Sequence, residues 1–294
     1  MILKNFEIHI VHYELLKERR SYLEKRLKYF GLEKFCFWHI QKINQDFSNL
    51  KKKYYKFDKD IWTERIKFSH DKITPSIMPR ELSHGDMKLG INELKLFDFL
   101  AERKGNNIYL ILEDDVILEE NFLDKLKKIL RILPKDFDIA YTDFGVNDAK
   151  KYLSVDNLQF KKLDKNHKKT RTTASFFINS KSAKKFSRDI KPFTLPLDHE
   201  LRYWEVKKNY NTYWLNGYLT YQGTIYGDIY PSSLFPTRVK EYYQRIPFYK
   251  KIILDFIKNT EAKRFNKSIF SKIQVNLLDL LIFLKNSIHV LDKR

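Results

Sequence analysis

Asn107 to Glu120 reads NIYLILEDDVILEE, an unbroken apolar run that ends in three acids. The apolar run from Ile108 to Leu112 is typical of a strand buried on both faces of a largely parallel sheet. Side chains alternate in direction along a strand, so we expect Glu113 and Asp115 on one side and Asp114 on the other. The segment therefore predicts an α/β protein with acidic side chains at the end of a central strand.

Three carboxylates at one strand end predict a site for a divalent cation. Ligands bind at the carboxyl ends of strands in open α/β sheets, and uncompensated carboxylates repel one another. The competing interpretation is a turn whose acids only cap a helix that starts near Glu119. An apolar strand that runs directly into Glu113, Asp114 and Asp115 favours the cation site.

Composition predicts a globular protein in a reducing compartment. The chain has 294 residues, 43% of them hydrophobic and 15% aromatic, which excludes a disordered or fibrous protein. Its single cysteine, Cys36, excludes an intramolecular disulfide. The first residues resemble no secretory signal, and the apolar run at 277–284 is far shorter than the roughly 20 residues that span a bilayer. We expect a cytoplasmic protein without a transmembrane helix.

The formal net charge of +19 calls for an anionic partner. Nucleic acid would satisfy it through phosphate contacts, but the lysines are scattered among 37 acids, and zinc-finger spacing, an RNP-type motif and a Gly-rich phosphate loop are all missing from the sequence. An anionic membrane surface or a sugar-phosphate substrate explains the charge equally well. We therefore expect no nucleic-acid partner.

The order of elements predicts a Rossmann-type mixed sheet flanked by helices. A strand at 6–11, a helix at 14–30 and a strand at 35–40 form a β-α-β unit, and Gly31 ends the helix. Later helices are expected at 81–103, 122–133 and from Lys181, which Ser180 would cap; later strands are expected at 137–142, 173–178, 213–215 and 218–222. Residues 41–80 are expected to form an insertion that is an acceptor-binding lid, a membrane-facing rim or merely solvated. Residues 145–170 are expected to form a loop or peripheral hairpin. The predicted catalytic domain is thus 1–237.

A second acidic candidate lies in LPLDHELRYW, residues 195–204. Asp198 follows Pro196 where a helix is expected to begin, so it is either a simple N-cap or a functional carboxylate at a helix N-terminus. His199 and Glu200 are secondary candidates for metal ligands, because the local sequence offers no partner at metal-binding spacing.

The motifs together resemble glycosyltransferase family 25, the lipooligosaccharide galactosyl- and glucosyltransferases. The resemblance covers about residues 1 to 230, with LILEDDV as its most specific motif, and includes Glu81-Leu82-Ser83, Gly85-Asp86-Met87, TASFFINSKSA and the Pro-Leu-Asp segment. It implies a GT-A-like fold and an inverting, metal-dependent transfer of galactose or glucose from a UDP-sugar to a lipooligosaccharide or lipopolysaccharide saccharide. It also implies a peripheral enzyme at the inner face of the bacterial inner membrane.

The resemblance also assigns residues. The acidic motif of the family falls on Glu113, Asp114 and Asp115, its early basic pair on Arg19 and Arg20, and its later aspartate on Asp198. These assignments imply Mn²⁺ or Mg²⁺ held by Glu113 and Asp115, donor binding by Arg19, Arg20 and Asp114, and Asp198 as the catalytic base. The chain departs from the family pattern at Asn92-Glu93, where a Ser-His pair is usual, and at Lys88, where glycine is expected.

Two other function classes stay open on the sequence. A metal-dependent phosphohydrolase also uses clustered acids at strand ends, and a basic nucleic-acid-binding protein would explain the charge but not the buried acidic strand. The segment from Arg238 onward carries 13 Lys or Arg against 5 Asp or Glu, with apolar residues at helical spacing. It predicts a basic helical C-terminal extension, residues 238–294, that lies on an anionic membrane or packs on the catalytic domain or a second subunit of a homodimer.

Overall fold

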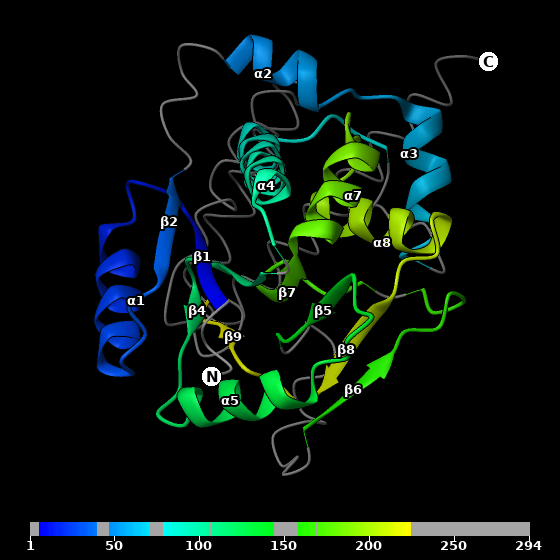
Figure 1. Cartoon of the computed structure of the whole chain (residues 1–294). Coiled ribbons are helices and arrows are strands. Elements are labelled where there is room, and N and C mark those ends of the chain that lie inside the picture. The colour runs from blue at the N-terminus through cyan, green and yellow to red at the C-terminus, as the bar shows by residue number, and fades with distance from the viewer. Residues whose placement is uncertain are drawn as a thin grey trace, which may run out of the picture.

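The central element is a seven-stranded mixed sheet (Figure 1). The computed structural model describes residues 6–39, 47–70, 79–105, 107–143, 158–168 and 170–224. The strand order is β2-β1-β3-β7-β5-β8-β6. In chain order these strands are β1 (Phe6–His12), β2 (Phe35–His39), β3 (Ile108–Glu113), β5 (Ile139–Tyr141), β6 (Gln159–Lys162), β7 (Ser175–Asn179) and β8 (Thr212–Asn216).

The acidic strand β3 lies inside this sheet, as its apolar run predicts. It pairs parallel to β1 on one side and antiparallel to β7 on the other, while β1 also pairs parallel to β2. The opening β-α-β unit is therefore confirmed. Strand β7 runs against its neighbours, so residues that precede it lie at the same edge of the sheet as residues that follow β3 and β5.

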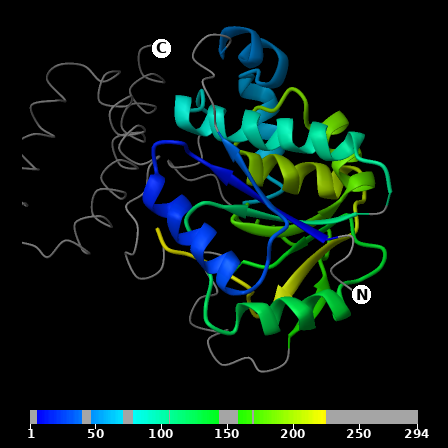
Figure 2. The ribbon, with the colours of Figure 1, turned by 60° about the vertical axis from the view of Figure 1, so that its left-hand side comes forward.

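Helices cover both faces of the sheet (Figure 2). One face packs against α1 (Lys17–Tyr29) and α5 (Phe122–Ile132), and the other against α4 (His84–Glu102), α7 (Ser180–Ile190) and α8 (Leu197–Lys207). Side chains of β3 alternate between the two faces and so contribute to a hydrophobic core on each. Leu110 and Leu112 pack in the core under α1 and α5, and Tyr109 and Ile111 pack in the core under α4, α7 and α8. The predicted α/β class with a mixed sheet between helical layers is confirmed.

The segment predicted as an insertion contains two short helices, α2 (Phe47–Tyr54) and α3 (Lys59–Ile66). Asp58 caps α3 by accepting hydrogen bonds from two backbone N–H groups. The link between the helices is tied to the chain after α7, because Lys56 and Phe193 donate backbone hydrogen bonds to Phe193 and Tyr54, at 3.0 and 2.8 Å. This part of the insertion is therefore packed on the core.

Two helix ends test the predicted capping. Gly31 adopts a φ of +69° directly after α1, the conformation for which glycine is favoured at a helix end. The expected cap of α7 was wrong by one residue: Asn179 accepts the bond from Ser182 N, at 2.8 Å, and Ser180 is already helical. An asparagine side chain at the end of a strand reaches the first helical turn as well as serine does.

A second, two-stranded sheet pairs β4 (Val116–Ile117) with β9 (Tyr221–Gln222). Strand β4 directly follows the acids Glu113, Asp114 and Asp115, for which the alternative interpretation was that they only cap the next helix. The α5 N-cap is Asn121, without a side-chain capping bond, so the acids after β3 do not cap that helix. Among the described helices, none combines the length and apolar character that a bilayer-spanning helix requires. The C-terminal extension, residues 41–46 and 71–78 of the insertion, and residues 144–157 lie outside the described residues.

Candidate active site

Glu113 ends β3 at the edge of the sheet where ligands bind in α/β folds. It accepts hydrogen bonds from the Thr173 hydroxyl at 2.6 Å and from Gln222 Nε2 at 3.1 Å. Loss of water around the carboxyl, reinforced by the charge of Asp115, raises the pKa of Glu113 to about 8. A cation bound beside Glu113 would stabilise its ionised form and so lower this pKa.

Asp114 turns away from Glu113 and binds the opposite side of the sheet edge, as strand alternation predicts. Its carboxylate accepts from Arg19 at 2.7 Å, from Tyr13 N at 2.9 Å and from His12 Nδ1 at 3.0 Å. Burial opposes its charge, but these hydrogen bonds outweigh burial and lower the pKa of Asp114. Asp114 therefore fastens the loop after β1 and the first turn of α1 to the end of β3.

Asp115 faces the segment around β9. One carboxylate oxygen accepts a hydrogen bond from the Thr224 hydroxyl, and its backbone oxygen accepts one from Gly223 N at 2.7 Å. The other carboxylate oxygen, Oδ1, is buried and has no hydrogen-bond partner among the described residues. Burial raises the pKa of Asp115. An orphaned carboxylate oxygen beside a second carboxyl group is the environment that a hard cation stabilises.

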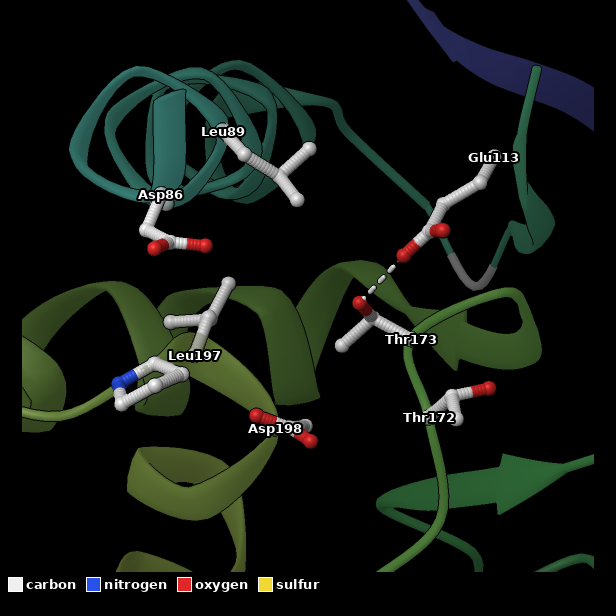
Figure 3. A pocket seen from close by; sticks show the side chains of 9 residues that line it. Asp86, Leu89, Glu113, Thr172, Thr173, Leu197 and Asp198 are labelled. Atoms are coloured by element: carbon white, nitrogen blue, oxygen red, sulfur yellow. Dashed lines mark hydrogen bonds between the residues drawn. The ribbon is translucent and has the colours of Figure 1, made fainter. Parts of the chain in front are cut away.

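A pocket of about 150 Å³ opens beside Glu113 (Figure 3). It lies between β3, the residues before β7, and the first turns of α4 and α8. Its carboxylates come from three separate elements: Asp86, Glu113 and Asp198. The remaining lining residues are Leu89, Gly90, Thr172, Thr173, Pro196 and Leu197. Acids meet small hydroxyl and apolar side chains here, a mixture suited to a polar ligand with C–H faces.

Asp198 belongs to the first turn of α8 and does not cap it. The N-cap position is Pro196, which makes no side-chain bond, and α8 begins at Leu197. The side chain of Asp198 is 26% exposed and lies on the wall of the pocket across from Thr172 and Thr173 (Figure 3). Its carboxylate accepts a hydrogen bond from His199 N at 3.0 Å. The N-cap alternative is therefore wrong. The N-terminal end of α8 stabilises a negative charge at this position.

The other predicted site residues, Arg19, Arg20 and Glu200, lie in different environments. Buried Arg19 pairs with Asp114, whereas Arg20 is exposed with its guanidinium 5.0 Å from the centre of the Phe37 ring. Glu200 is fully buried and accepts bonds from Arg65 at 2.8 and 2.9 Å. It therefore holds α3 to α8 instead of facing a ligand.

The two predicted metal ligands fit a cation as a pair. In the part of the chain that the structure describes, no three His, Cys, Asp or Glu side chains gather closely enough to hold an ion on their own. Mg²⁺ is commonly bound by one or two carboxylates together with substrate phosphates. Glu113, whose pKa the charge of Asp115 helps to raise, and the Asp115 Oδ1 atom, which has no hydrogen-bond partner among the described residues, match that donor set.

Comparison of the chain with models of known protein families gives a match. The model of glycosyltransferase family 25 (LPS biosynthesis protein) matches residues 5–201, two thirds of the chain. The chain belongs to glycosyltransferase family 25. The match runs from β1 into α8 and so includes Glu113, Asp115 and Asp198. No curated protein matches the chain. As a family 25 member it is a glycosyltransferase of LPS biosynthesis, which uses a glycosyl donor and a saccharide acceptor.

Several pocket residues escaped the sequence reasoning as candidates. Asp86 was hidden in a capping motif, since Ser83 caps α4 and donates to Asp86 at 2.7 Å. Thr172 and Thr173 precede β7, and only their position at the sheet edge makes them neighbours of Glu113. Predicting that β7 pairs antiparallel with β3 would have identified them, because the residues before an antiparallel strand lie beside the acids at the end of its neighbour.

Proposed function

We propose that this glycosyltransferase moves galactose or glucose from a UDP-sugar to a lipooligosaccharide or lipopolysaccharide saccharide, with inversion and with Mn²⁺ or Mg²⁺. The observation that carries the proposal is the meeting of Glu113 and Asp198 in one pocket, from elements 85 residues apart in the chain. A sugar transfer needs two functions on opposite sides of the reacting anomeric carbon. These functions are neutralisation of a leaving diphosphate and removal of a proton from the attacking hydroxyl.

Glu113 and Asp115 form the leaving-group side. A divalent cation bound there supplies positive charge that stabilises the developing diphosphate. Both carboxylates are fixed before any ligand arrives, Glu113 by Thr173 and Gln222, and Asp115 by Thr224. Such preorganisation lowers the reorganisation needed during the reaction.

Asp198 forms the acceptor side. As the acceptor hydroxyl oxygen bonds to the anomeric carbon, its proton passes to the Asp198 carboxylate. The bond from that carbon to the diphosphate oxygen breaks, and the UDP leaves with the electron pair. Attack from the side opposite the leaving group inverts the anomeric centre. Leu89 and Leu197 provide apolar contact for a sugar ring between the two carboxylates.

Arg19, Asp114 and Arg20 complete the proposed donor side. The Arg19–Asp114 pair fixes the start of α1 against the end of β3, and the exposed Arg20 of that helix, whose guanidinium lies over the Phe37 ring, is proposed to bind a phosphate oxygen. The basic residues of 238–294 are proposed to hold the enzyme at an anionic membrane surface, where a lipid-linked acceptor is found.

The test is donor turnover with and without an acceptor saccharide. UDP-galactose and UDP-glucose are incubated with purified protein and a truncated lipooligosaccharide, in Mn²⁺ or in EDTA, and the product is read by NMR. We expect transfer that needs both acceptor and metal and yields the inverted anomer. Hydrolysis that is equally fast without the acceptor would indicate a phosphohydrolase, and a retained anomer would refute the role given to Asp198.

A further inference from the structure

Asp86 is an acid of the pocket to which the proposed mechanism gives no role. It is the third residue of α4, and Leu89 and Gly90 follow it by three and four positions. Residues at this spacing share one face of a helix. One face of α4 therefore presents both a carboxylate and apolar surface to the pocket (Figure 3).

The Ser83 hydroxyl fixes the Asp86 side chain. It accepts a hydrogen bond from Asp86 N at 3.2 Å, which caps α4, and it donates one to Asp86 Oδ2 at 2.7 Å. A carboxylate has about four acceptor sites on its two oxygens, and this serine occupies one of them. Asp86 is thus held by its own helix end before a ligand binds, and such preorganisation favours a selective contact.

The charge of the pocket limits what Asp86 can bind there. Asp86, Glu113 and Asp198 line one space of about 150 Å³, so an anionic group such as a phosphate would be repelled. Within the described ranges, these three carboxylates do not gather closely enough to hold one metal ion together. A hydroxyl group fits instead, because it is neutral and donates a hydrogen bond.

The size and apolar lining of the pocket indicate a single sugar ring. Leu89 and Leu197 place C–H surface beside the carboxylates, which suits a ligand with hydroxyl groups and C–H faces. Pockets for drug-sized ligands enclose about 300–1,000 Å³. A pocket of about 150 Å³ therefore has room for one ring of a saccharide, with the rest of the saccharide outside.

The position of Asp86 indicates which sugar it contacts. In Figure 3 it lies above Leu197, on the side of the pocket away from Glu113. Its side chain extends from α4 toward the start of α8, where Asp198 directly follows Leu197. In the proposed reaction Glu113 serves the leaving group and Asp198 the attacking hydroxyl. A sugar that contacts both aspartates is therefore the acceptor.

We propose that Asp86 determines acceptor specificity by accepting a hydrogen bond from a hydroxyl group of the acceptor's terminal sugar, other than the hydroxyl that attacks. This inference rests on the proposed function, in which Asp198 activates the attacking hydroxyl. Contacts with two fixed carboxylates, Asp86 and Asp198, orient the ring for attack. A sugar without a hydroxyl group at the matching position loses one of these contacts and is rejected.

Binding of a saccharide to Asp86→Asn tests the inference, with Asp124→Asn as the matched control. Asp124 is also the third residue of its helix, α5, which packs on the other face of the sheet. Both variants remove a negative charge from a first helical turn, so a general effect on helix stability appears in both. Asparagine still offers Ser83 an oxygen, which preserves the cap of α4.

The probe is the delipidated saccharide of the truncated lipooligosaccharide, titrated by calorimetry into protein saturated with UDP and Mn²⁺. We expect Asp86→Asn to bind it about 10-fold more weakly than the wild type, because a hydrogen bond to a charged group becomes one to a neutral group. Asp124→Asn should bind it like the wild type, and the two variants should have similar UDP affinities and melting temperatures. Among saccharides that each lack one hydroxyl of the terminal sugar, one should bind the wild type about 10-fold more weakly but lose little further affinity in Asp86→Asn.

Wild-type saccharide affinity in Asp86→Asn would overturn the inference, as would an equal loss in Asp124→Asn. Weakened UDP binding with unchanged saccharide binding would place Asp86 on the donor side and overturn it too. A wild type that does not bind the saccharide, or additive losses for every deoxygenated saccharide, would also contradict it. Absence of sugar transfer by the wild type would instead refute the proposed function. These titrations contain no donor sugar, so they would still decide the role of Asp86.

Discussion

Replacing Asp114 by asparagine should destabilise the protein strongly, although Asp114 lies in the acidic motif of the proposed site. The carboxylate accepts from Arg19, His12 and Tyr13 N, and the side chains of Arg19 and Asp114 are only 6% and 10% exposed. An asparagine keeps one acceptor oxygen and presents an NH₂ group to the remaining donors. Arg19 would then be a buried cation without a full partner.

Breaking one partner of a buried ion pair costs about 3–5 kcal/mol in the free energy of unfolding. For a domain of this size each kcal/mol lowers the melting temperature by about 2–4 °C, which gives a decrease of about 6–20 °C. Asp115→Asn is the matched control, because Asp115 has no cation bonded to it among the described residues. In thermal unfolding at pH 7, the melting temperature of Asp114→Asn should therefore be clearly lower than that of Asp115→Asn.

The destabilisation should depend on pH. The pKa of Asp114 is lowered in the folded protein from its ordinary value of 3.8. A lowered pKa contributes stability that is fully present above the unfolded-state pKa and is lost as pH falls through the folded one. The difference between wild type and Asp114→Asn should thus be constant near neutral pH and shrink below about pH 4. An Asp114→Asn protein that melts like the wild type, or a difference that does not change in acid, would refute this reasoning.

Three further predictions concern other parts of the chain. Asp115→Asn should reduce metal-dependent turnover about a thousandfold or more while the fold survives, and wild-type turnover would remove Asp115 from the site. Gly90→Ala should lower the free energy of urea unfolding by about 1–3 kcal/mol, because the added Cβ meets Phe193 ring atoms at 2.8 and 3.0 Å; an unchanged midpoint would contradict this packing. Removing residues 273–294 should weaken binding to anionic liposomes more than turnover of a soluble acceptor, whereas unchanged liposome binding would favour packing of that segment on protein.

The sequence predicts those parts of the fold that have a local period. The apolar run of β3 and the helical spacing of apolar residues in α1 and α5 are local patterns that indicate buried faces. The predicted positions of these elements therefore agree with the structure to within a few residues. Strands β4 and β9 have only two residues each and pair across about a hundred positions. The strand predicted at 218–222 contains β9, but its partner β4 was not predicted, because nothing local marks a two-residue strand whose hydrogen bonds come from a distant segment.

In the candidate site, too, local features could be predicted from the sequence and contacts between distant segments could not. Alternation correctly predicts that Asp114 and Glu113 point to different partners, although Asp114 and Asp115 form the turn between β3 and β4 instead of continuing the strand. The partners of these acids come from distant segments, such as Thr173 and Arg19, and no spacing in the sequence encodes them. The burial of polar residues in α4 has another cause. Because this helix is covered on more than one side, its buried face, which includes Asn92 and Glu93, is wider than the apolar stripe that periodicity detects.

Steady-state kinetics of Asp198→Asn test the central claim most directly. The account assigns Asp198 a proton that moves only in the transition state. Asp198 is not the N-cap of α8, and its carboxylate accepts one backbone hydrogen bond there, from His199 N at 3.0 Å, which an asparagine oxygen can also accept. Turnover should therefore fall by at least about 100-fold, with UDP affinity and melting temperature close to those of the wild type. An Asp198→Asn enzyme that transfers sugar at the wild-type rate would show that the pocket beside Glu113 is not where the acceptor is activated.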